Sequence, residues 1–492
     1  MDTEVWRAER LLIDGKQVAA TGGRTFDNVN PATEEVIGVA ADGSAPDMDA
    51  AIAAARRAFD TTTWSTDVDL RVRCLRQLAD ALAENAELIR ATIVAEVGSP
   101  LVLTYGPQLD SPLGGVQWVA DLVERYEWEQ DLGNAEPFGV PSHRYARREA
   151  AGVVAAITPW NFPMQINLAK VVPALGAGNT VVLKPAPDTP WTALLVGQIV
   201  AERTDIPPGV LNIVTSSDHQ VGAQLSADPR VDMVSFTGST ATGRRIMVAA
   251  ADTIKKTFLE LGGKSALIAL DDADLATAAI GAAFQITTHA GQGCAVTSRL
   301  LLPRARLDEG VDAVVDAVKQ IPYGDPTDPT VMMGPLIRES QRRRVLGYIR
   351  TGVDEGATVA LGGGVPANVE RGYFVEPTVL VDVDPDATVA QEEIFGPVLV
   401  VLPYDDDDHA VEIANRSAYG LSGGVVSADH ERARAVGNRI RTGTMSLNGG
   451  VYYGADVPFG GRGQSGNARE WGVAGFEEFL DLKTIGLGSA GT

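Results

Sequence analysis

The chain has 492 residues and a net charge of −23, from 41 basic and 64 acidic side chains. It is too long for one hydrophobic core, so two or three domains are expected. With 45% hydrophobic and 21% charged residues, it has the composition of a globular protein and not of a disordered one. Because so acidic a surface repels phosphate backbones, nucleic acid is not expected as a partner.

Targeting signals and cysteines narrow the class further. The first seven residues show neither the basic nor the apolar segment of a signal peptide, and no run approaches the roughly 18 apolar residues of a membrane span. A cytoplasmic protein without a membrane partner is therefore expected. The two cysteines, Cys74 and Cys294, are too few for a disulfide framework or a thiolate-rich zinc site. Since the five histidines also lack ligand spacing, no metal is expected.

The N-terminal part begins with a strand-like run near residues 10–14. Apolar residues then recur every three or four positions over 47–59 and again over 69–97, which predicts two amphipathic helices. Cys74 lies within the second helix and is interpreted as a packed structural residue.

From residue 153 the pattern changes to short apolar runs, each followed by turn residues and a helical pattern. These runs lie at 153–157, 180–183, 210–214 and 233–236. Unbroken apolar strands that alternate with helices indicate a parallel sheet covered on both faces. Ligands of such sheets bind at the carboxyl ends of the strands. The unusual segments 159–163, 184–185 and 237–239 lie at those ends.

A second α/β pattern follows, with a strand at 299–302 and helices at 308–320 and 340–352. A hairpin-like stretch at 137–148 and a strand-like run at 479–487 belong to neither sheet, and are candidates for strand pairing between subunits. The predicted fold is therefore α/β, with two parallel-sheet domains and a small β arm. The predicted units are 1–130 with 151–261, 262–465, and the arm 131–150 with 475–492.

Cys294 lies in the segment Gly-Gln-Gly-Cys-Ala over 291–295. A structural cysteine normally has bulky apolar neighbours, whereas small residues leave the sulfur accessible and let backbone approach a substrate. Thiols of this kind react as thiolates, usually after a base, a cation or a helix amino end has lowered their pKa of about 8.5. From this segment alone, a catalytic thiol and a structural one are equal alternatives.

Two further side chains are ambiguous when taken singly. Glu260 stands between two leucines, so it either lies on an exposed strand face or is a buried carboxylate with a raised pKa, as a general base requires. Taken alone, the strand-face interpretation is favoured. Asn161 lies between Pro159 and Pro163, and its amide either donates to a developing oxyanion or belongs to an ordinary turn.

A cofactor site is indicated by the segment 237–243, which follows a strand and opens a helix. Small residues at a helix start suit a pyrophosphate. The spacing, however, is neither the G-x-G-x-x-G fingerprint nor a P-loop. Lys184, just beyond a strand end, either reaches a ribose or is a solvated lysine.

The order of these elements is more informative than any one of them. Asn161, Lys184, Gly238, Glu260, Cys294 and the segment Glu-Glu-Ile-Phe-Gly-Pro over 392–397 together resemble the NAD(P)-dependent aldehyde dehydrogenase superfamily, and the resemblance runs from residue 28 to residue 461. It implies that the Cys294 thiolate attacks an aldehyde, that Asn161 and the cysteine's own N–H hold the oxyanion, and that hydride passes to the nicotinamide to leave a thioester. Glu260 then activates the water that hydrolyses it, and Glu470 assists proton movement.

The resemblance also implies a cofactor site. Lys184 matches the lysine that binds the adenosine ribose, Gly238 and Ser239 face the pyrophosphate, and Glu393 and Phe395 lie at the nicotinamide ribose and ring. The predicted set is completed by Ile157, Trp160 and Gly262. Many NAD-specific members have a glutamate three residues after the lysine, where this chain has Pro187. Asp188 is a candidate substitute, so NAD is favoured and NADP stays possible.

The positions that match the family's substrate tunnel are mostly apolar, and none is a lysine or arginine: Phe162, Ile166, Ala169, Thr288, Tyr453 and Phe459. They favour an apolar aliphatic or aromatic aldehyde over the semialdehyde of a dicarboxylic acid. A CoA-acylating semialdehyde dehydrogenase is an alternative, disfavoured by the presence of Glu260. A non-catalytic, crystallin-like structural protein is another, disfavoured by Cys294 and Glu260. A homodimer or homotetramer is expected.

Overall fold

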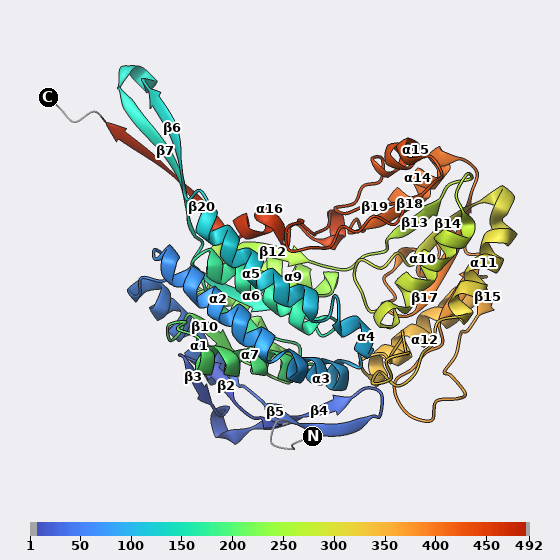
Figure 1. The fold of residues 1–492 in the computed structure, drawn as a ribbon, viewed down its shortest axis with the longest axis horizontal. Coiled ribbons are helices and arrows are strands. Elements are labelled where there is room, and N and C mark those ends of the chain that lie inside the picture. The colour runs from blue at the N-terminus through green and yellow to red at the C-terminus, as the bar shows by residue number, and fades with distance from the viewer. Residues whose placement is uncertain (1–6, 489–492) are drawn as a thin grey trace.

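The computed structural model describes residues 7–488, which fold around two seven-stranded sheets (Figure 1). The first sheet has the strand order β12-β11-β8-β9-β10-β2-β3, and its strands from β12 to β10 are parallel. Its strands are β2 (Leu11–Ile13), β3 (Lys16–Val18), β8 (Val153–Ile157), β9 (Thr180–Lys184), β10 (Leu211–Ile213), β11 (Met233–Thr237) and β12 (Lys256–Glu260). The parallel sheet predicted from residue 153 onwards is confirmed.

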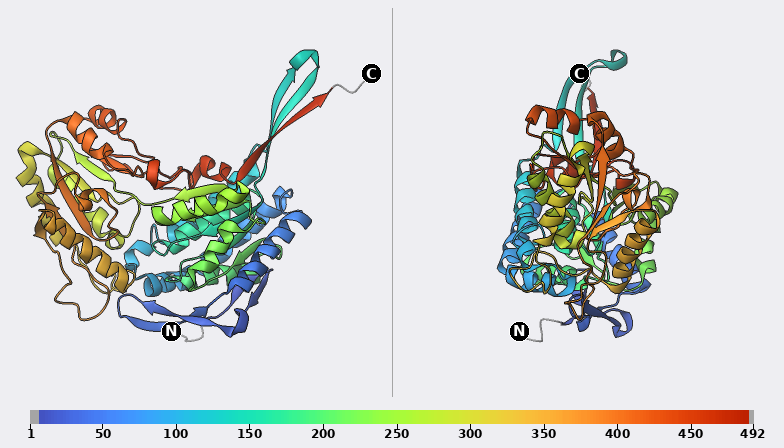
Figure 2. Two further views of the ribbon diagram at one scale, coloured as in Figure 1. Left: turned by 180° about the vertical axis from the view of Figure 1, so that it is seen from behind. Right: turned by 90° about the vertical axis from the view of Figure 1, so that its right-hand side faces the viewer.

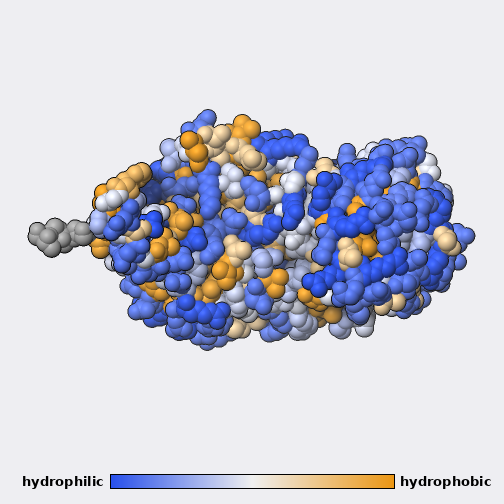
Figure 3. Space-filling model, turned by 90° about the horizontal axis from the view of Figure 1, so that it is seen from above, coloured by the Kyte–Doolittle hydropathy of each residue, from blue (hydrophilic) through white to orange (hydrophobic). Residues whose placement is uncertain are grey.

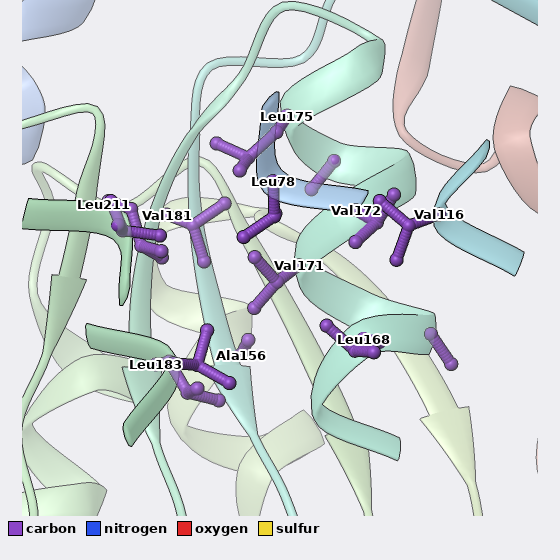
Figure 4. Close-up of a cluster of buried hydrophobic side chains, with 14 of the residues drawn as sticks. Leu78, Val116, Ala156, Leu168, Val171, Val172, Leu175, Val181, Leu183 and Leu211 are labelled. Atoms are coloured by element: carbon purple, nitrogen blue, oxygen red, sulfur yellow. The ribbon is translucent and has the colours of Figure 1, made fainter. Parts of the chain in front are cut away.

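Helices cover both faces of this sheet because successive strand residues point to opposite sides. On β9, Val181 and Leu183 face one core while Val182 faces the other. Figure 4 shows the first core, in which Val171 and Leu175 of α6 lie near Val181. That face is covered by α2 (Val68–Glu84), α3 (Ala86–Val97), α5 (Asp110–Arg125), α6 (Pro163–Gly176) and α7 (Pro190–Arg203), and the other by α1 (Ala45–Thr61), α8 (His219–Ala227) and α9 (Thr240–Ala250).

The second sheet has the order β15-β16-β17-β14-β13-β18-β19 and is parallel except at β15. Its strands are β13 (Ala266–Ala269), β14 (Arg299–Pro303), β15 (Thr358–Leu361), β16 (Thr378–Val381), β17 (Val398–Tyr404), β18 (Gly423–Val426) and β19 (Ser446–Leu447). One face is covered by α10 (Leu275–Thr287) and α11 (Leu307–Lys319), and the other by α12 (Glu339–Asp354), α13 (Thr388–Gln391), α14 (Asp407–Asn415) and α15 (His430–Gly437).

A three-stranded antiparallel arm extends from the body (Figure 2). It consists of β6 (Glu129–Ala135), β7 (Ser142–Ala150) and β20 (Leu480–Gly488), with β7 in the middle; α16 (Gly472–Glu477) precedes β20. The predicted hairpin at 137–148 is wrong in its first strand, because residue 137 lies in the turn and β6 begins at Glu129. Most of β6 is exposed, so its sequence carries no apolar alternation.

The long helix predicted over 69–97 is also wrong, since two helices, α2 and α3, meet at Asn85. The Asn85 side chain donates a hydrogen bond to the Ala81 carbonyl and so competes with the backbone ladder at that point. The short α4 (Leu101–Thr104) follows. A separate small sheet, β1 (Arg7–Ala8), β5 (Glu35–Ala41) and β4 (Thr25–Asn30), lies near the N-terminus.

The fold class is thus two parallel-sheet units with a β arm, as predicted. The exact domain boundaries stay predictions, and residues 1–6 and 489–492 of the predicted units lie outside the described residues. Within residues 7–488, no helix combines the length and apolarity that crossing a bilayer requires.

Candidate active site

Residues carried by both sheets meet around Cys294. Asn161 follows β8 and Glu260 ends β12, so both stand at carboxyl ends of the first sheet, whereas Cys294 precedes β14 of the second. The backbones approach closely, because a Cβ on Gly263 would lie 2.4 Å from the Cys294 carbonyl oxygen. Only glycine permits that contact. The segment that follows Glu260 and the loop that carries Cys294 therefore lie against each other, although they are far apart in the sequence.

The Cys294 thiol is partly exposed and packs against an apolar cluster of Ala295, Leu421, Tyr452 and Phe459. Burial raises the pKa of the thiol, and the carboxylates of Glu260, Glu393 and Glu470 raise it further. The resting thiol is therefore protonated, and a base must take its proton when it reacts.

The backbone before Cys294 is strained. His289, Ala290 and Gly291 have φ angles of 48°, 52° and 69°, a run of three residues in the left-handed region. Left-handed backbone costs about 1–3 kcal/mol at each of the two non-glycine positions. At Gly291 a side chain would also collide, since a Cβ would lie 2.1 Å from the Gly396 carbonyl oxygen. Strain of this size persists only where the surroundings hold it.

Asn161 is buried and fixed at two points. Its side-chain Nδ2 donates a hydrogen bond of 2.9 Å to the Gln292 backbone carbonyl. Its backbone carbonyl accepts a hydrogen bond of 2.9 Å from the Gln108 side chain. An amide nitrogen has two N–H groups. One is used by Gln292, and the other can serve a ligand oxygen.

Glu260 is 2% exposed, and neither of its carboxylate oxygens accepts a hydrogen bond from a side chain within residues 7–488. Burial raises the pKa of this carboxyl well above its usual range, and the nearby Glu470 raises it further. Of the two sequence interpretations, the buried carboxylate is therefore correct and the exposed strand face is wrong.

Glu470 forms a buried ion pair that the sequence reasoning missed. Its Oε1 accepts hydrogen bonds from Lys170 Nζ at 2.8 Å and from Thr237 Oγ1 at 3.3 Å. Lys170, on α6, is fully buried and lies over the ring of Phe258 at 4.7 Å. A lysine in the apolar run 168–172 was the available signal, because lysine is almost never fully buried unless it is paired.

Lys184, which ends β9, is buried, and its Nζ contacts the Pro185 carbonyl at 3.3 Å. Burial lowers the pKa of its amine to about 8. Gly238 packs on Phe236, and Ser239 caps α9 by accepting a hydrogen bond from the Thr242 N–H. These residues lie at strand ends of the first sheet, where the sequence placed them.

Asp188 is not free to take the place of the missing glutamate. Its Oδ2 forms an ion pair of 2.5 Å with Arg338 Nη1, and Arg338 comes from the second sheet's side of the molecule. The Arg338 guanidinium also lies 5.8 Å from the ring centre of Trp160. The carboxylate of Asp188 therefore already has a cationic partner.

The remaining predicted cofactor residues form two contacting groups, with Ile157 at the end of a strand. Glu393 Oε1 accepts a hydrogen bond of 2.9 Å from the Gly263 N–H, and a Cβ on Gly262 would lie 2.4 Å from Glu393 Oε2. Burial raises the pKa of Glu393 to about 7. Phe395 packs edge-on against Trp160 at 5.4 Å, while Ile157 ends β8.

The predicted substrate residues do not all behave alike. Phe459 packs beside Cys294. The ring of Tyr453, a residue that is 52% exposed, stacks on the ring of Phe459, with 5.4 Å between the ring centres. Of these two rings, Phe459 is the buried one and Tyr453 the exposed one. Phe162 lies edge-on against His289 at 5.4 Å. Thr288 is half-buried, whereas Ile166 and Ala169 are buried on α6, with Ala169 packed into the core of the first sheet.

Residues 18–485 match the model of the aldehyde dehydrogenase family. A 3-succinoylsemialdehyde-pyridine dehydrogenase from Pseudomonas sp. is 44% identical over 478 residues, which cover 96% of this chain and 98% of the relative. An aldehyde dehydrogenase from Mycobacterium tuberculosis, solved with NAD+, is 40% identical with a TM-score of 0.94, over 98% of this chain and 99% of that one. A variant of aldehyde dehydrogenase C from Pseudomonas syringae, solved with NAD+ and octanal, is 39% identical with a TM-score of 0.92, over 97% and 96%. The chain therefore belongs to the aldehyde dehydrogenase family.

Proposed function

We propose that this protein oxidises an aldehyde to its carboxylic acid with NAD+, with Cys294 as the nucleophile. The observation that carries the proposal is the meeting of three groups from two sheets. These are an accessible thiol, the fixed amide of Asn161 and the buried, unpaired carboxylate of Glu260. Together they are the parts that acyl chemistry requires: a nucleophile, an oxyanion donor and a base.

In the proposed first step, the Cys294 sulfur bonds to the aldehyde carbon as a base takes the thiol proton. The oxyanion of the resulting thiohemiacetal accepts hydrogen bonds from Asn161 Nδ2 and from the backbone N–H of Cys294. When bound, NAD+ supplies the acceptor for the hydride that leaves this carbon, and a thioester remains on Cys294. A fixed donor of the Asn161 kind is worth about 3 kcal/mol in such steps.

In the second step, Glu260 takes a proton from a water molecule, which attacks the thioester carbon. The C–S bond breaks, the carboxylic acid leaves, and the thiolate is restored. A carboxylate whose pKa is raised by burial is a suitable base near neutral pH. The pair of Lys170 and Glu470, next to Glu260, is proposed to assist the departure of that proton.

For the cofactor, we assign Lys184, Gly238 and Ser239 to the adenosine and pyrophosphate side. Gly262, Glu393, Phe395, Trp160 and Ile157 are assigned to the nicotinamide side. The residues present fit such a group, because Gly262 leaves space for the Glu393 carboxylate, whose Oε2 would lie 2.4 Å from a Cβ at that position, while Gly263 lies against the Cys294 carbonyl. NAD+ is the proposed cofactor, because both compared structures were solved with NAD+. NADP+ is the alternative.

For the substrate, we propose an apolar aliphatic or aromatic aldehyde. The stacked rings of Tyr453 and Phe459 beside Cys294 offer apolar contacts along the approach to the thiol. The Pseudomonas syringae relative was solved with octanal, which is consistent with this class. Release as acyl-CoA is the disfavoured alternative, because Glu260 is the proposed base that activates water for hydrolysis of the thioester. A purely structural role is disfavoured by the complete set of reacting groups.

The β arm supports a homodimer or homotetramer. Five of its apolar side chains are exposed, namely Leu132, Phe138, Val140, Leu482 and Leu487, and hydrophobic residues are visible on the arm in Figure 3. An exposed sheet with apolar side chains is a surface for strand or face pairing. A cytoplasmic location is also proposed, since both cysteines are unpaired.

The test is a panel of octanal, benzaldehyde and succinate semialdehyde, assayed with each cofactor by the absorbance of the reduced nicotinamide. Octanal or benzaldehyde with NAD+ is expected to give the highest kcat/KM, and Cys294→Ser is expected to abolish oxidation. Glu260→Gln should keep one rapid turnover and then slow by about 10²–10⁴-fold, because the thioester forms but is not hydrolysed.

Each result can contradict a different part of the proposal. If Cys294→Ser oxidises the aldehyde as fast as the wild type, Cys294 is not the nucleophile. Acyl-CoA as the product would replace hydrolysis by thiol transfer. A much higher kcat/KM for succinate semialdehyde would overturn the apolar substrate class.

A further inference from the structure

The strained turn before Cys294 is not held by its own side chains. Both ring nitrogens of His289 lack a hydrogen-bond partner within residues 7–488, and Ala290 has no polar side chain. The His289 ring instead packs against Phe162. Because left-handed backbone at two such residues is unfavourable, another group must stabilise the turn.

Gln292 supplies that stabilisation. Its side chain is fully buried, and Nε2 donates to the carbonyls of His289 at 3.1 Å and Pro335 at 3.2 Å. Its Oε1 accepts a hydrogen bond of 2.9 Å from the Ile337 N–H. The side-chain nitrogen and oxygen of Gln292 therefore both take part in linking the left-handed turn to the segment that leads into α12.

The backbone of Gln292 also contacts the other half of the site. Its carbonyl accepts the hydrogen bond from Asn161 Nδ2, at 2.9 Å, across the boundary between the two sheets. Next to it, Gly291 packs directly on Gly396 of the loop that carries Glu393. One residue thus fixes the nucleophile loop relative to the oxyanion donor.

We propose that Gln292 is a positioning residue, which holds the turn 289–291 so that the Cys294 thiol and the Asn161 amide face the same carbonyl group. The catalytic part of this inference rests on the proposed function. A displacement of about 1 Å at reacting atoms can slow a reaction by about 10²-fold. Loss of the Gln292 side-chain hydrogen bonds should therefore lower kcat and leave cofactor binding unchanged.

The decisive variant is Gln292→Glu, which keeps the shape and replaces the amide by a titratable group. While protonated, the new carboxyl retains one donor and one acceptor. Once ionised, it has no donor and faces two carbonyl oxygens. The ratio of variant to wild-type kcat should therefore fall at least about tenfold between about pH 6 and pH 9, since burial places such a pKa in or near this range.

The matched control is Asn179→Asp. Asn179 is also fully buried, with Nδ2 donating to the carbonyls of Ala174 and Phe479 and Oδ1 accepting from the Gly152 N–H. It lies at the amino end of β9, opposite the candidate site. Asn179→Asp should lower the Tm of the protein about as much as Gln292→Glu does. The ratio of its kcat to the wild-type kcat should stay constant with pH.

A second readout does not depend on substrate. The rate at which iodoacetamide alkylates Cys294, followed by mass spectrometry, should differ at least about threefold between Gln292→Glu and wild type at high pH, and by less than that for Asn179→Asp. NAD+ affinity, measured by calorimetry, should remain within about twofold of wild type in both variants.

The proposal is overturned if Gln292→Glu shows a constant kcat ratio over this pH range and an unchanged alkylation rate. Should this variant fail to fold, Gln292→Met is scored by alkylation alone, and a wild-type rate overturns the proposal. If the wild-type protein oxidises no aldehyde, the proposed function fails, but the alkylation rates still decide the role of Gln292.

Discussion

The two thiols of the chain illustrate how the surroundings of one residue decide its chemistry. Cys74, on α2, is fully buried, and burial raises the pKa of its thiol to about 11. Cys294 also has a raised pKa, but it is partly exposed and three carboxylates contribute to the shift. Accessibility, and not the pKa of the free protein, distinguishes the candidate nucleophile from the structural thiol.

A pH dependence follows at this scale. Because the pKa of Cys294 is raised, the reactive thiolate becomes more abundant as pH rises, and its alkylation by iodoacetamide should accelerate up to at least about pH 9 without a plateau. Mass spectrometry of the alkylated peptides gives the rate. Cys74 is the internal control and should stay unmodified in the folded protein. A plateau near pH 7 would contradict the raised pKa.

The candidate residues that sequence could group into one site were those whose segments follow a recognisable order along the chain, although each was ambiguous in its own segment. Cys294, Asn161 and Glu260 stand in short segments whose order matches a family. Lys170 was missed because nothing nearby in the sequence indicates its partner, Glu470, which lies 300 residues away. The contacts of Gln292 were equally invisible, since Pro335 and Ile337 are 43 and 45 residues distant.

Among the elements, the central strands were the most predictable. β8, β9 and β11 are buried on both faces, so apolar residues dominate each of them. β6 is exposed on most of its length and left no such pattern. The break between α2 and α3 was hidden because apolar residues continue at helical spacing through Asn85.

The link between α6 and the segment that carries Glu470 predicts a change in stability. Lys170→Met would leave the Glu470 carboxylate buried without its cation, which should lower the free energy of unfolding by about 3–5 kcal/mol. The double variant Lys170→Met with Glu470→Gln removes both charges and should recover most of this loss. Denaturant titrations followed by circular dichroism measure both. A single variant within about 1 kcal/mol of wild type would refute the pair's contribution.

For the whole molecule, the arm is the feature that a single subunit leaves unexplained. β20 runs antiparallel to β7 over nine residue pairs, yet Leu482 and Leu487 on it are more than half exposed. Apolar side chains on a projecting sheet are more readily explained by contact with another subunit than by solvent.

The variant Leu482→Asp with Leu487→Asp should therefore shift the protein towards a smaller assembly, because it places charge on an apolar contact surface. Light scattering coupled to size-exclusion chromatography gives the mass. Val365→Asp, which changes an exposed apolar residue outside the arm, should leave the mass unaltered. A monomeric wild type, or an unchanged mass in the double variant, would contradict this assignment of the arm.

The division of the site between two sheets has a consequence for how such proteins diverge. The thiol belongs to the segment before β14, whereas the Glu260 carboxylate ends β12. In the proposed mechanism, the nucleophile and the base that releases the acyl group therefore come from different sheets, although the oxyanion donor Asn161 belongs to the same sheet as Glu260. On the proposed roles, changes near β12 would alter the acyl acceptor while the captured aldehyde stays the same. Changes around Tyr453 and Phe459 would alter the aldehyde while water remains the acceptor.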